Sequence, residues 1–186
     1  MRRNRVTAGM GLVLLAALAA VAPALAGPEP VRAQIVGYGE YESLPHVRIE
    51  DAPGTAAGAV GVVERDPPLV ARTTAIVAAE GVSFGVQVSA PTLGPDQTVP
   101  VTVRLDHPPI TAPDGRVWRT QTSDGLLTRE PRFRGFCFDH AWELAAGEWT
   151  YTFLHEGRPI ARQSFTLTVD PNRRVEGRCS PEPGIS

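Results

Sequence analysis

The segment 147–169 most constrains the fold, because it contains two stretches of alternating residues joined by a tight turn. In the first stretch apolar side chains recur at every second position and share one face of a strand, which carries Trp149, Tyr151 and Phe153. The second stretch, near the end of the segment, alternates in the same way. Between them, Gly157 allows the positive φ angle that a tight turn needs. A hairpin with one apolar face must pack against a second sheet, so this segment predicts a layered β fold.

The remaining sequence supplies enough strands for two sheets. Runs of alternating or β-branched residues predict strands over 34–41, 59–64, 71–77, 82–89, 99–105, 117–122 and 126–128. The best helical segment, 139–146, is no longer than about two turns, and Asp139 would cap it. We therefore predict an all-β protein, an antiparallel two-sheet immunoglobulin-like β-sandwich of about seven to nine strands over residues 33–170.

Turn-forming residues separate these strands. Ser123-Asp124-Gly125 predicts a hairpin turn between two short strands. The segment 43–58 is rich in proline and glycine and predicts a loop. The segment 107–115 (HPPITAPDG) contains three prolines and predicts a second loop.

The first 26 residues have the three parts of a secretory signal. Arginines at positions 2, 3 and 5 precede an uncharged apolar run over 10–22, and Ala24-Leu25-Ala26 matches a cleavage site. This pattern predicts a periplasmic or secreted protein without stable membrane insertion after cleavage; the alternative is an uncleaved membrane anchor. Residues 27–32 form a linker, and 171–186 form a tail rich in proline and glycine.

Composition excludes several functional classes. Cleavage would remove three arginines and no acidic residue, which changes the formal net charge from −2 to −5. An acidic protein is a poor candidate for nucleic-acid binding, which favours a basic face. All 18 basic residues are arginines, so Schiff-base chemistry on lysine is excluded. Both methionines, Met1 and Met10, lie in the leader, so the mature chain has no thioether ligand for copper.

Cys137 and Cys179 are the only cysteines. In an exported protein such a pair predicts a disulfide, which here would tie the C-terminal tail to the body of the domain. Two free thiols are the alternative. No close pair of ligands with metal-binding spacing occurs, and we predict neither a metal site nor a cofactor.

Three segments occur in a particular order and spacing: 76–85 (IVAAEGVSFG), 107–111 (HPPIT) and 138–149 (FDHAWELAAGEW). Together they resemble a family of exported bacterial proteins of unknown function, each with a single β-sandwich domain. The resemblance covers residues 34–169 and implies the sandwich fold. It implies no activity, cofactor or catalytic residue.

Catalytic candidates are few. Gly81-Val82-Ser83-Phe84-Gly85 matches the G-x-S-x-G pattern of hydrolases, but Ser83 lies within a predicted strand rather than at a strand-to-helix turn. The four histidines, His46, His107, His140 and His155, lack metal-binding spacing. Asp139, His140 and Glu143 are close enough in sequence to form an acid–base cluster. The alternative is that Asp139 caps a turn and His140 lies on the surface.

One cluster of residues is a candidate binding site: Arg116, Trp118, Arg119, Arg132 and Arg134. Arginine binds carboxylates through two hydrogen bonds, and tryptophan stacks on sugar rings and peptides. The alternative is a solvated strand face without a ligand.

We interpret the protein as a non-catalytic binding or interaction module, not an enzyme, with an unknown protein or glycan of the cell envelope as its partner. The second hypothesis is a protease-inhibitor-like or chaperone-like sandwich that presents the 107–115 loop. The third is a weak hydrolase that uses Asp139, His140 and Glu143.

Overall fold

The computed structural model describes residues 31–175 together with Gly177 and Cys179. The predicted leader and part of the predicted tail lie outside these residues. Among the described residues, no helix is both long and apolar enough to cross a membrane.

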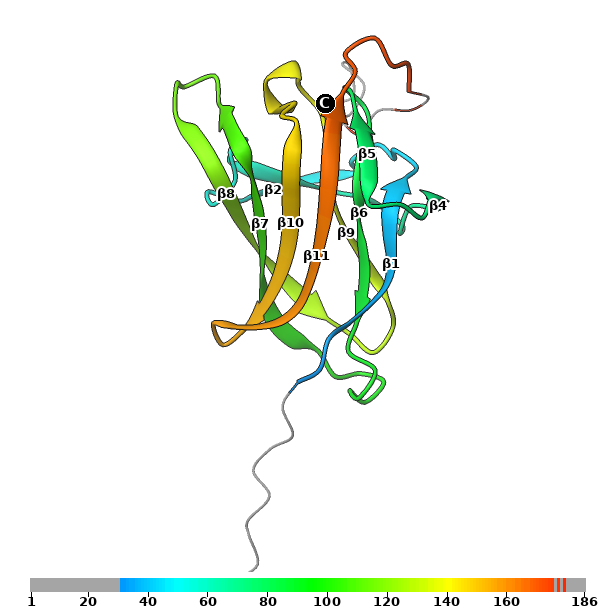
Figure 1. Ribbon diagram of the computed structural model, residues 1–186. Coiled ribbons are helices and arrows are strands. Elements are labelled where there is room, and N and C mark those ends of the chain that lie inside the picture. The colour runs from blue at the N-terminus through cyan, green and yellow to red at the C-terminus, as the bar shows by residue number, and fades with distance from the viewer. Residues whose placement is uncertain (1–30, 176, 178, 180–186) are drawn as a thin grey trace, which may run out of the picture.

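Two sheets face each other and form a sandwich, and a separate pair of strands crosses it (Figure 1). The first sheet has the order β4-β1-β6-β9, with β4 Leu69–Ala71, β1 Gln34–Tyr41, β6 Ser83–Ser89 and β9 Arg132–Cys137. The second has the order β5-β11-β10-β7-β8, with β5 Ala75–Ala78, β11 Arg158–Val169, β10 Gly147–His155, β7 Val99–Thr111 and β8 Val117–Leu127. The crossing pair is β2 Arg48–Asp51 with β3 Ala59–Val62, and a short 3₁₀ helix, η1, spans Ala141–Glu143.

The predicted two-sheet sandwich is confirmed, with four and five strands in its sheets. Strand pairing in the described residues is antiparallel except between β5 and β11, which run parallel. The predicted hairpin 147–169 is present as β10 and β11. Its turn places both Glu156 and Gly157 at positive φ, 50° and 75°.

Aromatic side chains fill the space between the sheets. Phe84 of β6 lies at the centre, with its ring centroid 5.8 Å from that of Trp149 and 5.2 Å from that of Phe165. Trp149, Phe153 and Phe165 are almost completely buried, which confirms that the hairpin packs its apolar face against the opposite sheet.

The predicted loop 107–115 is wrong over its first half, because β7 continues through its first two prolines to Thr111. The register of β7 and β8 is interrupted between Asp106 and Ile110, so Pro108 and Pro109 need no ladder hydrogen bond. His107 is buried, and its ring stacks on Trp149 with the centroids 4.7 Å apart.

Four other local predictions are corrected. The expected turn at Ser123-Asp124-Gly125 lies within the continuous strand β8. The predicted loop 43–58 contains β2, and the predicted strand 71–77 is divided between β4 and β5. The residue at the N-cap of η1 is His140 rather than Asp139.

Candidate functional site

A hairpin crosses the open side of the sandwich, and we name residues 47–62, which contain β2 and β3, the strap. Figure 1 shows it running across the strands of both sheets, and neither of its strands joins either sheet. Its tip is held on β8, because the Ala56 amide donates to Gln121 Oε1 (2.9 Å) and the Thr122 amide donates to the Gly54 carbonyl (2.8 Å). These two hydrogen bonds hold the tip of the strap against the five-stranded sheet.

The base of the strap is held by the C-terminal tail. The amide of His46, the residue before the strap, donates to the carbonyl of Cys179 at 2.8 Å. Cys179 is bonded to Cys137 at the end of β9, with the two Cα atoms 6.3 Å apart. The predicted disulfide is therefore present in the structure, and it fixes the second end of the strap.

A cavity of about 170 Å³ lies beneath the strap. Its walls come from the strap, from β7, β8 and β9, from the segment after β9, and from Tyr151 of β10. An outer cleft of about 530 Å³ shares several lining residues with it, among them His46, Gly61 and Arg134. These three residues therefore lie between the inner cavity and the outer cleft.

Tyr151 lines the inner cavity and is only 3% exposed. Its hydroxyl oxygen is buried and has no hydrogen-bond partner among the described residues. Burial raises the pKa of this hydroxyl far above its usual value, so it stays protonated. Leaving a buried hydroxyl without a partner costs about 1–3 kcal/mol, so this group favours any bound atom that can pair with it.

Glu143, in η1, brings a buried carboxyl group to the same cavity. Its Oε2 accepts a hydrogen bond from the His140 amide at 2.9 Å. Burial, with a smaller contribution from the nearby carboxylates of Asp139 and Glu80, raises the pKa of Glu143 to about 7, although its hydrogen bond from the His140 amide acts in the opposite direction. Glu143 is therefore close to half protonated at neutral pH.

His46 and Asp139 also line the cavity. Burial lowers the pKa of His46, while the negative charge of Asp139 opposes that shift. The imidazole lies directly over Gly61 of β3, where a methyl group would come within 2.2 Å of the ring. The sequence identified His46 only as a histidine without metal-binding spacing, so its place in this site was missed.

Gly61→Ala is expected to move the His46 imidazole out of its position between the two cavities, because the new methyl group occupies the same space. The measurement is the ¹H–¹³C spectrum of the His46 ring. We expect a large shift of the His46 Cε1 resonance. The ring of His155, the last residue of β10, does not line the cavity and should change little. An unchanged His46 resonance would contradict this placement.

Arg134 connects the two sheets beside the cavity. Its Nη1 donates to the Phe133 carbonyl (2.9 Å) and its Nη2 to the Leu126 carbonyl at the end of β8 (3.2 Å). Burial lowers the pKa of its guanidinium, and the negative charge of Asp66 opposes that shift. Arg134 therefore links β9 to the end of β8 and also lines the cavity.

The structure separates the five residues of the predicted binding cluster. Arg116 lies over the Trp118 ring at 5.1 Å from its centroid, near the β7–β8 turn. Arg119 is exposed on β8, whereas Arg132 and Arg134 belong to β9 in the other sheet. Of the five, Arg134 alone lines the inner cavity.

The structure brings together two of the three hydrolase candidates. Asp139 and Glu143 line the cavity, but His140 is exposed and stacks on Trp142, with ring centroids 5.7 Å apart. Ser83 is the first residue of β6, and the next element along the chain is the strand β7, so it is not at the strand-to-helix turn that the hydrolase motif needs.

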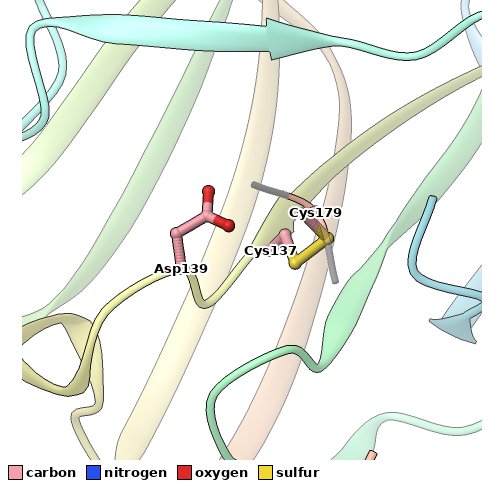
Figure 2. A group of neighbouring side chains, drawn as sticks. All are labelled: Cys137, Asp139 and Cys179. Carbon is pink, nitrogen blue, oxygen red and sulfur yellow. A yellow bond between two sulfur atoms is a disulfide. The ribbon is translucent and has the colours of Figure 1, made fainter. Parts of the chain in front are cut away.

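Figure 2 shows Asp139 beside the disulfide. One carboxylate oxygen and the sulfur atoms of Cys137 and Cys179 lie within 4.8 Å of one another. Metal ions bind thiolates, and neither sulfur is a thiolate while the disulfide is intact. This group therefore does not form a metal site in its present state.

Comparison with known proteins gives a family and a fold. No curated protein matches the chain. A crystal structure of an immunoglobulin-like protein from Pseudomonas aeruginosa is similar to it with a TM-score of 0.51 and 19% identity, covering 76% of this chain and 100% of that one. At this identity the likeness shows the immunoglobulin-like fold alone. Residues 38–167 match the family described as a domain of unknown function, DUF3859. The chain therefore belongs to this family, as the sequence resemblance predicted.

Proposed function

We propose that this protein is a non-catalytic binding module of the periplasm or the cell exterior, and that it binds a small polar ligand in the cavity beneath the strap. The observation that carries the proposal is that Tyr151 lines the cavity while its buried hydroxyl has no hydrogen-bond partner among the residues that the structure describes. Unpaired polar groups are rare in protein interiors and need an explanation, and a bound molecule supplies one.

Export is supported by the Cys137–Cys179 bond. Disulfides form and persist in oxidising compartments and are rare in the cytosol. The leader-like sequence of residues 1–26 points in the same direction.

The cavity has stronger support as the binding site than the cluster around Trp118. Arg116 already forms an ion pair with Asp114 and covers the Trp118 ring, so this tryptophan face is occupied. A protein or glycan partner at that cluster is the alternative that the test below separates.

The inhibitor-like hypothesis has less support. A presented loop should protrude, but His107 and Ile110 are buried within β7. Of the predicted loop, only residues 112–115 lie outside the strands, in the turn between β7 and β8.

Tyr151→Phe tests the binding site. We expect the unliganded variant to be as stable as the wild type or more stable by about 1–3 kcal/mol, since a hydroxyl without a partner is removed. We also expect a loss of binding to polar fragments of about ten non-hydrogen atoms or fewer, the size that such a cavity accommodates. The measurement is a fragment screen by ¹H–¹⁵N NMR, with Tyr38→Phe on β1 as the matched control.

Shifts at Glu143 and Tyr151 in the wild type and in Tyr38→Phe, but not in Tyr151→Phe, would support the proposal. Shifts confined to Trp118 and its neighbours would contradict it and favour the surface cluster.

A further inference from the structure

We propose that His107, Gln121 and the Ala56 amide form a proton-sensitive latch, which holds the tip of the strap against β8 while His107 is neutral and loosens it when His107 is protonated. The latch borders the cavity beneath the strap, because Gln121 lines that cavity. Its effect on ligand exchange rests on the proposed function, whereas the latch itself does not.

The latch is a buried chain of hydrogen bonds. The Ala56 amide donates to Gln121 Oε1 at 2.9 Å, and Gln121 Nε2 lies 3.1 Å from His107 Nε2. The other ring nitrogen, His107 Nδ1, lies 2.7 Å from the carbonyl oxygen of Pro108. His107, Gln121 and Ala56 are only 7%, 6% and 8% exposed. Each partner in the chain is therefore needed, because little water reaches these atoms.

The main-chain groups at the two ends of the chain allow a single placement of the protons. A backbone amide can only donate, and a carbonyl oxygen can only accept. The Ala56 amide therefore fixes the oxygen of the Gln121 side chain on its own side, which leaves the NH₂ group facing His107. At the other end, the Pro108 carbonyl requires a proton on Nδ1 of the ring. His107 is thus neutral in the closed latch, and its Nε2 accepts.

A second proton on His107 disrupts this chain. The new Nε2–H would face the NH₂ group of Gln121, and two donors cannot pair. If the Gln121 amide turns by half a rotation, its oxygen accepts from Nε2–H, but its NH₂ group then faces the Ala56 amide. A buried donor without an acceptor is costly, so the Ala56 amide is driven towards water. Protonation of His107 thus favours the state in which the tip is loosened from β8.

The surroundings of His107 place its titration below pH 6.5. Burial lowers the pKa of the imidazole from 6.5, while the Pro108 carbonyl and the charge of Asp106 partly oppose the shift. Asp106 already forms an ion pair with Arg104. The neighbouring strands present two uncharged side chains to the ring: Trp149 and Gln121. The 3₁₀ helix η1 also packs against β7, and its Glu143 titrates higher, near pH 7.

The tip of the strap forms part of the walls of two spaces. Thr55 and Ala57, on either side of Ala56, line the inner cavity. Residues 52–54 line a groove of about 380 Å³, which shares Thr122 with the inner cavity. Because the tip contributes to both linings, its displacement would connect the cavity with the groove and give a ligand a route of entry and exit.

The placement of the protons is tested first, on the exported protein at pH 7.5. A two-bond ¹H–¹⁵N spectrum of the imidazole rings shows which nitrogen of each ring carries a proton. We expect the proton of His107 on Nδ1, with Nε2 unprotonated. A proton on Nε2 at this pH would overturn the latch.

Hydrogen exchange at the Ala56 amide then measures the latch at pH 7.5 and pH 5, after division by the intrinsic exchange rate at each pH. We expect the protection of Ala56 to fall by about tenfold at pH 5, the effect of losing one hydrogen bond. The Val47 amide, which donates to the Val62 carbonyl at the base of the strap, should change little. Unchanged protection of Ala56, or an equal loss at Val47, would overturn the proposal.

Two substitutions separate His107 from His46 and Glu143, which also titrate in the range between these pH values or close to it. His107→Gln cannot take up a proton, so Ala56 should keep its protection at pH 5. Gln121→Glu supplies a carboxylate that accepts both from the Ala56 amide and from protonated His107, so protection should also persist. A tenfold loss of protection in His107→Gln would overturn the role of His107.

Butan-1-ol, a small probe that is uncharged at both pH values, tests the link to the cavity. NMR line shapes at Tyr151 give its rate of exchange between free and bound states. We expect this rate to be about tenfold higher at pH 5 than at pH 7.5 in the wild type, and equal at both in His107→Gln. Equal rates in the wild type would overturn the link and leave the cavity as the binding site. Absence of binding would overturn the link together with the proposed function.

Discussion

Replacing both Cys137 and Cys179 by serine is expected to lower the free energy of unfolding by about 4 kcal/mol. The bond closes a loop with a sequence separation of 42 residues, and closing a loop of this length restricts the unfolded chain by about that amount. Equilibrium urea unfolding, monitored by tryptophan fluorescence, measures the change. The double substitution leaves no reactive thiol, so the comparison is not affected by oxidation.

The same substitution should loosen one end of the strap. The His46 amide donates to the Cys179 carbonyl, whereas the Ala56 amide donates to Gln121 at the tip. Arg173 still holds the preceding part of the tail through its ion pair with Glu40. We therefore expect faster hydrogen exchange at His46 and little change at Ala56. A loss of stability below about 1 kcal/mol, or equal acceleration at both amides, would contradict this account.

Glu143→Gln is expected to remove a large pH-dependent loss of stability. The pKa of this carboxyl rises from 4.5 in the unfolded chain to about 7 in the fold. The stability that the protonated form contributes is fully present below pH 4.5 and is lost as the pH rises through 7. The loss amounts to about 3 kcal/mol by pH 8.

The difference between wild type and variant isolates this group from the others. Lowered pKa values of His46 and His107 act in the opposite direction, because stability from those residues is lost as the pH falls. Unfolding free energies are measured for both proteins at pH 5 and pH 8. The stability of Glu143→Gln relative to wild type should be higher at pH 8 than at pH 5. Glu130→Gln, at an exposed position, is the control. A constant difference between variant and wild type would contradict burial of the Glu143 carboxyl.

The sandwich could be predicted because burial on one face leaves a pattern of period two. That pattern marks β1, β6, β7, β10 and β11, and each was expected within a few residues of its observed bounds except at the end of β7, which continues through the predicted loop to Thr111. Of the two strands of the strap, β3 was expected within the predicted strand 59–64, whereas β2 was missed for the same physical reason. All four residues of β2 are exposed, so no alternation distinguishes it from a loop.

Glycine and proline account for two of the errors. Gly125 lies within β8, where a methyl group would come 3.1 Å from Val103 Cγ2, so this glycine allows close packing rather than a turn. The adjacent prolines of β7 lie at a break in its register with β8, where no ladder hydrogen bond is required. Neither situation can be recognised without the neighbouring strand.

The candidate site was only partly predictable. Asp139 and Glu143 were selected because they are close in sequence, and Arg134 because it belongs to a run of arginines. Tyr151 alternates with Trp149 and Phe153, so the sequence shows its ring to be core but not that its hydroxyl has no partner in the part of the chain that the structure describes. That property depends on segments distant in the chain, which converge only in the fold.

The most direct test of the central claim is a crystal structure of the exported protein, at a resolution that defines the cavity, from crystals exposed separately to butylammonium, butan-1-ol and butyrate. Our account predicts density for a bound probe in the cavity, with a polar atom within hydrogen-bonding distance of Tyr151 Oη. A cavity that holds only water with every probe would contradict the account. So would a cavity closed by the strap with the Tyr151 hydroxyl paired to a protein atom.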